Sequence, residues 1–223
     1  MKNFPDRFRI ATLLTALLLG WFAIATIFAE ALTPKTQRFS QALALPDPKI
    51  PYGSLADWAV AAAPLRGDLL ADIAMERAAP VLNLGKAPLT PEIMATREAA
   101  LTRAKQSLSL APHSASMWLL VAMLQSGGPR QEAAAEALKM SYLTSRGDAN
   151  LIPARLAILS AATAIADVEL KNLARGDIRL ILTRRSDLKA AITNAYRRGS
   201  VDGKAYIAEV VRSLDPSFAA SLQ

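Results

Sequence analysis

A long hydrophobic segment lies near the N-terminus, where no charged residue occurs between Ile10 and Ala29. Twenty helical residues extend about 30 Å, which is the thickness of the hydrocarbon core of a bilayer. The segment is apolar on every side of a helix, as expected of a lipid-exposed helix and not of one packed on a protein core. We therefore expect a transmembrane helix over residues 10–29.

The charges that flank this segment predict its orientation. The leader, residues 1–9, carries three basic residues and one acidic residue, and basic flanks stay on the cytoplasmic side. The chain is thus expected in a bacterial inner membrane, with the leader in the cytoplasm and the rest in the periplasm. A cleaved signal peptide with a site at Ala29-Glu30-Ala31 is the alternative, although the segment exceeds the usual length of a signal-peptide core. Both interpretations place the bulk of the protein across the membrane.

Prolines and helix-starting residues divide the remaining chain. Three prolines between Pro46 and Pro51 predict a linker that completes a stalk over residues 30–53. From residue 54 to residue 223, apolar residues recur at three- and four-residue steps, which predicts an all-α domain. A helix that begins at Asp68 is expected to stop at Pro80. The other expected helix starts are Ser54, Thr90-Pro91, Ser114, Glu132, Asn150, Asp167, either Ser186 or Asp187, and Ser200.

The clearest supersecondary pattern runs from Glu98 to Tyr142. A helix ends before a proline turn, a second helix opens with tryptophan, and Gly127-Gly128 separates it from an alanine-rich third helix. This pattern resembles the tetratricopeptide repeat (TPR), whose units of about 34 residues are pairs of antiparallel helices. The residues at its packing positions are Ala100, Pro112, Trp118, Ala122, Ala134 and Leu138.

The resemblance covers residues 95–145 and departs from the repeat at two points. Gln125 stands where an aromatic residue is usual, and Arg146-Gly147 stands where a proline is expected. The resemblance implies a TPR-like array of helical hairpins that holds a partner protein or peptide on its concave face, without catalysis. A scaffold protein in envelope assembly or polysaccharide export would hold its partner in this way, without catalysis.

The positive charge is concentrated in the C-terminal half. The chain has a net charge of +7, and residues 171–212 contain ten basic and four acidic residues. Lys171, Arg175 and Arg179 follow one face of a helix if that helix continues through Gly176. These three residues and the pair that follows form the predicted anion-facing surface: Lys171, Arg175, Arg179, Arg184 and Arg185.

Two interpretations of this surface remain open. It binds anionic lipid or acidic glycan, or it is an ordinary solvated helix face. Nucleic acid is not expected, because the predicted compartment lacks it and few aromatic residues accompany the basic ones.

The sequence contains no recognisable catalytic or cofactor motif. With no cysteine and only His113 among histidines, thiolate and multi-histidine metal sites are excluded within one chain. His113 is expected to be a turn or capping residue, and the carboxylate pairs Glu92/Glu98 and Asp68/Asp72 suit the positive ends of helices. We therefore expect no catalytic residue, no metal and no cofactor.

Overall fold

The computed structural model describes residues 4–32, 65–83, 90–126, 131–161 and 166–222. Every element within these ranges is helical, which confirms the predicted all-α class for this part of the chain. The predicted proline linker, the helix start at Ser54 and the Gly127-Gly128 break lie outside the described residues. The helices are α1 (Phe4–Leu32), α4 (Gly67–Asn83), α5 (Pro91–Leu110), α6 (Ala115–Gln125), α7 (Gln131–Thr144), α8 (Ile152–Ala161), α9 (Val168–Arg184), the 3₁₀ helix η2 (Ser186–Leu188), α10 (Lys189–Arg198), α11 (Val201–Leu214) and α12 (Pro216–Ala220).

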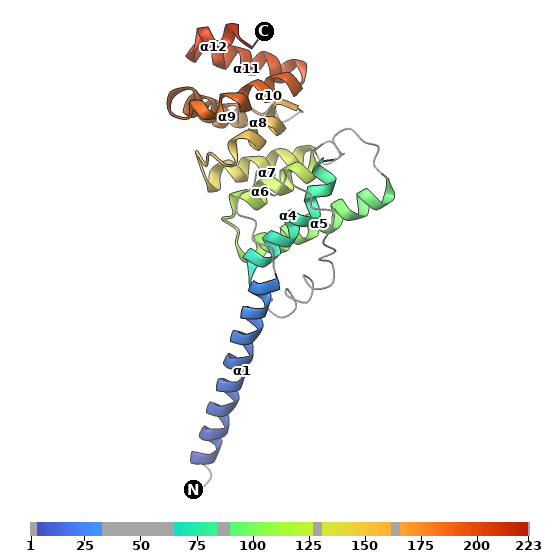
Figure 1. Ribbon diagram of the computed structural model, residues 1–223, viewed down its shortest axis with the longest axis vertical. Helices are drawn as coiled ribbons and strands as arrows, with labels where there is room; N and C mark the ends of the chain where they lie inside the picture. The colour runs from blue at the N-terminus through green and yellow to red at the C-terminus, as the bar shows by residue number, and fades with distance from the viewer. Residues whose placement is uncertain (1–3, 33–64, 84–89, 127–130, 162–165, 223) are drawn as a thin grey trace.

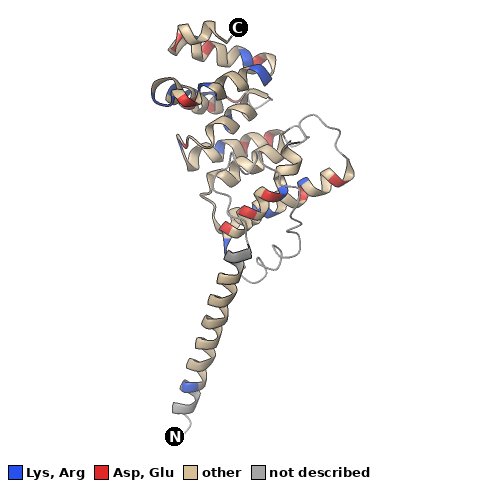
Figure 2. Ribbon diagram, viewed as in Figure 1, with Lys and Arg blue, Asp and Glu red and all other residues tan. Residues whose placement is uncertain are grey.

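Helix α1 contains the predicted apolar segment. A stretch of 21 residues, Phe8–Phe28, has a mean hydropathy of 2.2 and is long and apolar enough to cross a membrane. The helix extends away from the other helices (Figure 1), and few charged residues interrupt it (Figure 2). Its side chains are largely uncovered, with only 6% of the apolar window buried.

The remaining helices form a stack that begins with α4 and α5 and ends with α12, at the opposite end of the molecule from the N-terminus (Figure 1). Helix α4 packs along α5, and α6 packs along α7, so the first part of the stack consists of helical hairpins. The pairing then changes, because α8 packs mainly on α10 and less on α9. The strict alternation of hairpins that the repeat pattern predicts is therefore clear only for α4 to α7.

A close backbone approach fixes the position of α8 against α11. A Cβ atom at Gly203 would lie 2.2 Å from the carbonyl oxygen of Ser160, so only glycine fits. The same oxygen accepts hydrogen bonds from the backbone N–H of Ser200 (2.8 Å) and from its hydroxyl (3.1 Å). The Ser200 hydroxyl also caps α11 by accepting from the Gly203 N–H. The end of α8 is thus bonded to the start of α11.

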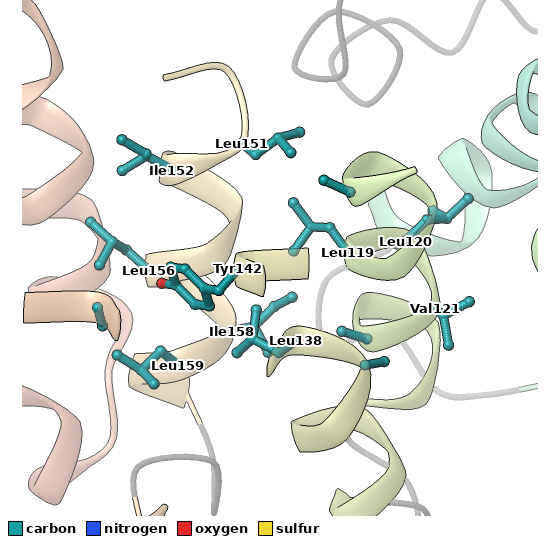
Figure 3. Close-up of a cluster of buried hydrophobic side chains, with 14 of the residues drawn as sticks. Leu119, Leu120, Val121, Leu138, Tyr142, Leu151, Ile152, Leu156, Ile158 and Leu159 are labelled. Atoms are coloured by element: carbon teal, nitrogen blue, oxygen red, sulfur yellow. The ribbon is translucent and has the colours of Figure 1, made fainter. Parts of the chain in front are cut away.

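The hydrophobic core runs continuously from α4 to α11. Figure 3 shows one part of it, where α6, α7 and α8 meet around Leu138 and Tyr142. Four of the predicted packing residues are buried in this core, each with 5% or less of its surface exposed: Ala100, Ala122, Ala134 and Leu138. The three alanines among them allow neighbouring helices to approach closely, whereas Leu138 fills the core between helices.

A hydrogen bond joins Pro112 and Trp118 at the turn before α6. The Pro112 side chain is exposed. Its backbone carbonyl oxygen accepts a hydrogen bond of 2.7 Å from the Trp118 indole N–H. Trp118 is only half-buried and lies against the edge of the core. Its indole N–H needs a polar partner, and the turn before α6 supplies one.

The predicted helix starts are mostly confirmed. Thr90 and Asp167 cap α5 and α9 by accepting backbone N–H hydrogen bonds in the first turn. Ser114 precedes α6 as predicted but makes no capping bond. The expected stop at Pro80 is wrong, because α4 continues to Asn83. Proline removes a single helical hydrogen bond there, and the packing of the last turns holds the helix together.

Candidate functional site

An open groove lies between α9 and α11 near the far end of the stack. It has a volume of about 530 Å³. Its lining residues come from the first half of α9, from a position two residues before that helix, and from the first ten residues of α11: Ala166, Val168, Lys171, Asn172, Arg175, Asp202, Ala205, Tyr206, Glu209 and Val210. The groove brings two of the predicted anion-facing residues, Lys171 and Arg175, into one concave surface.

The two helices give the groove charges of opposite sign. Helix α9 contributes Lys171 and Arg175, and α11 contributes Asp202 and Glu209. Within the described part of the chain, none of these four side chains forms an ion pair. Arg175, Asp202 and Glu209 are exposed, and Lys171 is half-buried. The groove therefore presents both signs of charge to solvent.

Tyr206 joins the two sides of the groove. Its hydroxyl donates a hydrogen bond to the backbone carbonyl oxygen of Lys171. Burial raises the pKa of the Tyr206 hydroxyl to about 12, against the opposing effect of the nearby Arg175 guanidinium. The hydroxyl thus stays protonated at neutral pH and serves as a fixed link between α9 and α11.

The rest of the predicted anion-facing surface is divided. Helix α9 is continuous through Gly176, where a Cβ atom would meet no atom of a neighbouring element within 4 Å. Lys171, Arg175 and Arg179 therefore share one helix face, as the sequence predicts for an uninterrupted helix. Arg184 is exposed, whereas Arg185 forms a two-pronged ion pair with Asp187 at 2.9 and 2.7 Å.

A buried arginine lies where α7, α8 and α9 meet. Arg155 is fully buried and donates to the hydroxyl of Ser141 (3.1 Å) and to the carbonyl oxygens of Ser141 (2.5 Å) and Ser145 (3.0 Å). Its guanidinium carbon is 4.6 Å from the centre of the Tyr142 ring. These carbonyls belong to the C-terminal end of α7, where a cation suits the helix dipole.

Asp177 supplies a second buried charge from α9. Its side chain is 4% exposed, and burial raises the pKa of its carboxyl to about 6, although the Arg155 guanidinium acts to lower it. In the described part of the chain, Asp177 Oδ2, Tyr142 Oη and Arg155 Nη1 have no hydrogen-bond partner. The charge on this carboxylate is thus only partly compensated.

Sequence reasoning missed both buried charges, although the periodicity contained a signal. Arg155 lies three residues after Ile152 and four before Leu159, both of which are fully buried. Asp177 has the same relation to the buried Ala174 and Ile181. Residues at these steps share a helix face, so each charged residue occupied a position on the core side.

The other candidate residues do not form a chemical centre. Within the described ranges, no group of three or more histidine, cysteine, aspartate or glutamate side chains could hold a metal ion. His113 is exposed in the turn before α6. Comparison with protein-family models, curated proteins and solved structures finds no match to this chain. The resemblance to the tetratricopeptide repeat therefore stays a prediction.

Proposed function

We propose that the protein is a non-catalytic, single-pass protein of the bacterial inner membrane whose TPR-like domain binds another envelope protein or peptide in the periplasm. The observation that carries the proposal is helix α1, whose window Phe8–Phe28 is long and apolar enough to span a bilayer and is 6% buried. A lipid environment would cover these side chains. The helical stack beyond it is then a domain held at the membrane, as a scaffold for envelope assembly or polysaccharide export would be.

The orientation is tested by labelling single cysteines, because the natural chain has none. Asn3→Cys marks the leader, and Ala99→Cys marks an exposed position on α5. In cells with a permeabilised outer membrane, a membrane-impermeant maleimide should label Ala99→Cys, whereas Asn3→Cys should react only after the inner membrane is broken. The reverse pattern contradicts the proposed topology. The intact mass of the purified protein distinguishes an anchor from a cleaved signal peptide.

Partner binding is tested by photo-crosslinking in intact cells. A photoreactive residue is placed at one exposed position on each of three helices: Ala99 on α5, Ala190 on α10 and Ala205 on α11. A protein that binds the stack should be trapped at one or more of these positions as an adduct of discrete mass. If no position yields a specific adduct, the function as an interaction module is refuted.

Direct binding of anionic lipid or glycan is the second candidate function. It is favoured by Arg175, Arg179 and Arg184, which are exposed on α9. Charge reversal at Arg175, Arg179, Arg184 and Arg185 should then abolish co-sedimentation with phosphatidylglycerol vesicles or an acidic polysaccharide, and salt should weaken the wild-type binding. Co-sedimentation that is insensitive to these substitutions excludes this function.

A further inference from the structure

We propose that the groove between α9 and α11 binds a short peptide segment of a partner protein that carries an acidic and a basic side chain beside an apolar one. This inference rests on the proposed function as an interaction module and assigns it a site and a ligand class. The groove has the volume of an ordinary ligand pocket, about 530 Å³. Such a volume accommodates a few side chains of a peptide and not a folded surface.

The apolar part of the groove favours a ligand with a hydrophobic side chain. Val168, Ala205 and the Tyr206 ring line the groove together with the buried Val210. Val168 opens α9 and is 69% exposed, although it is a large hydrophobic residue. The Tyr206 hydroxyl is already bonded to the Lys171 carbonyl oxygen, so its ring offers contact area and not a hydrogen-bond donor. A leucine-sized side chain would cover this surface.

The charges of the groove select a ligand with both signs. Lys171 and Arg175 stand one helical turn apart on α9, where they can meet a carboxylate. Asp202 and Glu209 stand about two turns apart on α11, where they can meet a basic side chain. A purely anionic ligand, such as a lipid headgroup or an acidic glycan, would be repelled by the acidic side of the groove. A mixed-charge peptide satisfies both sides.

The test is a binding titration with the full-length protein in non-ionic detergent. The probe is a fluorescein-labelled, Ala- and Gln-rich peptide with Lys-Leu-Glu at its centre, which in a helix places the two charges on either side of the leucine. Two matched probes replace the lysine or the glutamate by glutamine. The mixed-charge probe should bind about tenfold more tightly than either matched probe, and its affinity should fall at high salt.

Charge-reversal variants locate the binding. The double variant Lys171→Glu/Arg175→Glu and the double variant Asp202→Lys/Glu209→Lys should each weaken the mixed-charge probe by about tenfold or more. The double variant Arg179→Glu/Arg184→Glu reverses the same number of charges outside the groove and should leave the affinity unchanged. Circular dichroism checks that all three variants remain folded.

Three results overturn the inference. The first is equal binding of the mixed-charge probe and the matched probe in which glutamine replaces lysine. The second is a loss of affinity in Arg179→Glu/Arg184→Glu as large as that in the two groove variants. The third is no binding of the mixed-charge probe. None of them refutes the proposed function, which the cysteine labelling and the crosslinking at α5 and α10 test separately. Failure of those cellular experiments together with specific peptide binding would instead contradict the proposed function alone.

Discussion

The buried carboxylate of Asp177 should make the protein less stable as the pH rises from about 4 to about 6. The folded protein holds the proton with a pKa of about 6, compared with the ordinary value of 3.8 for aspartate. Between these values the folded state binds more protons than the unfolded chain, so the free energy of unfolding falls with rising pH. The difference between the two pKa values corresponds to roughly 3 kcal/mol in the free energy of unfolding. This contribution to stability is present below about pH 4 and is fully lost above about pH 6.

Replacing Asp177 by asparagine removes the cost of ionisation while keeping the shape of the side chain. At about pH 7.5 we expect Asp177→Asn to be more stable than the wild type by up to roughly 3 kcal/mol, and at about pH 4 we expect nearly equal stability. The substitution also removes the attraction to Arg155. That attraction lowers the pKa of Asp177, but burial outweighs it, so the net effect of neutralisation remains favourable at neutral pH.

The assay is urea unfolding of the full-length protein in non-ionic detergent, followed by circular dichroism at both pH values. Glu209→Gln is the matched control, because it converts an exposed carboxyl on the neighbouring helix to an amide. The control should keep the pH dependence of the wild type. If Asp177→Asn is less stable than the wild type at about pH 7.5, the electrostatic attraction to Arg155 outweighs the cost of burial, and the reasoning is refuted.

The same unfolding assay checks three further substitutions. Gly203→Ala should destabilise by about 2 kcal/mol or more, because its Cβ would lie 2.2 Å from the Ser160 carbonyl oxygen; unchanged stability would contradict this close approach. Gly176→Ala, in the open middle of α9, should instead stabilise by about 0.5–1 kcal/mol through helix propensity, and destabilisation would indicate that the site is not open. Leu138→Ala, at a fully buried position, should cost about 2–5 kcal/mol, and a loss below about 1 kcal/mol would place Leu138 outside the core.

Sequence reasoning identified the features that depend on neighbouring residues in the chain. The caps at Thr90, Asp167 and Ser200 are local, since each side chain accepts a backbone N–H two or three residues away. The apolar helix α1 was evident from the length of its uncharged segment, and the resemblance to the tetratricopeptide repeat placed the small residues Ala100 and Ala122 at packing positions.

The features that sequence reasoning missed depend on contacts between distant segments. The hydrogen bonds at Ser160 join residues 40 positions apart, and no local pattern encodes the pairing of α8 with α10. The groove arises in the same way, because α9 and α11 are separated in the chain by η2 and α10. The stripe Lys171–Arg179 was visible in the sequence, whereas the acidic side opposite it was not.

Two arginines, the half-buried Arg97 and the buried Arg155, explain how an alanine-rich stack of helices acquires a defined register. Alanine faces pack closely but distinguish poorly between neighbouring helical registers, so other contacts must fix the position of each hairpin. Arg97 on α5 bonds the carbonyl oxygens of Leu124 and Ser126 at the end of α6, the latter at 2.6 Å. Arg155 on α8 bonds corresponding carbonyls at the end of α7. The α6/α7 hairpin is therefore held at the C-terminal end of each helix by a cation from the adjoining helix, and a one-turn slip on either side would break these bonds and leave buried carbonyls unsatisfied.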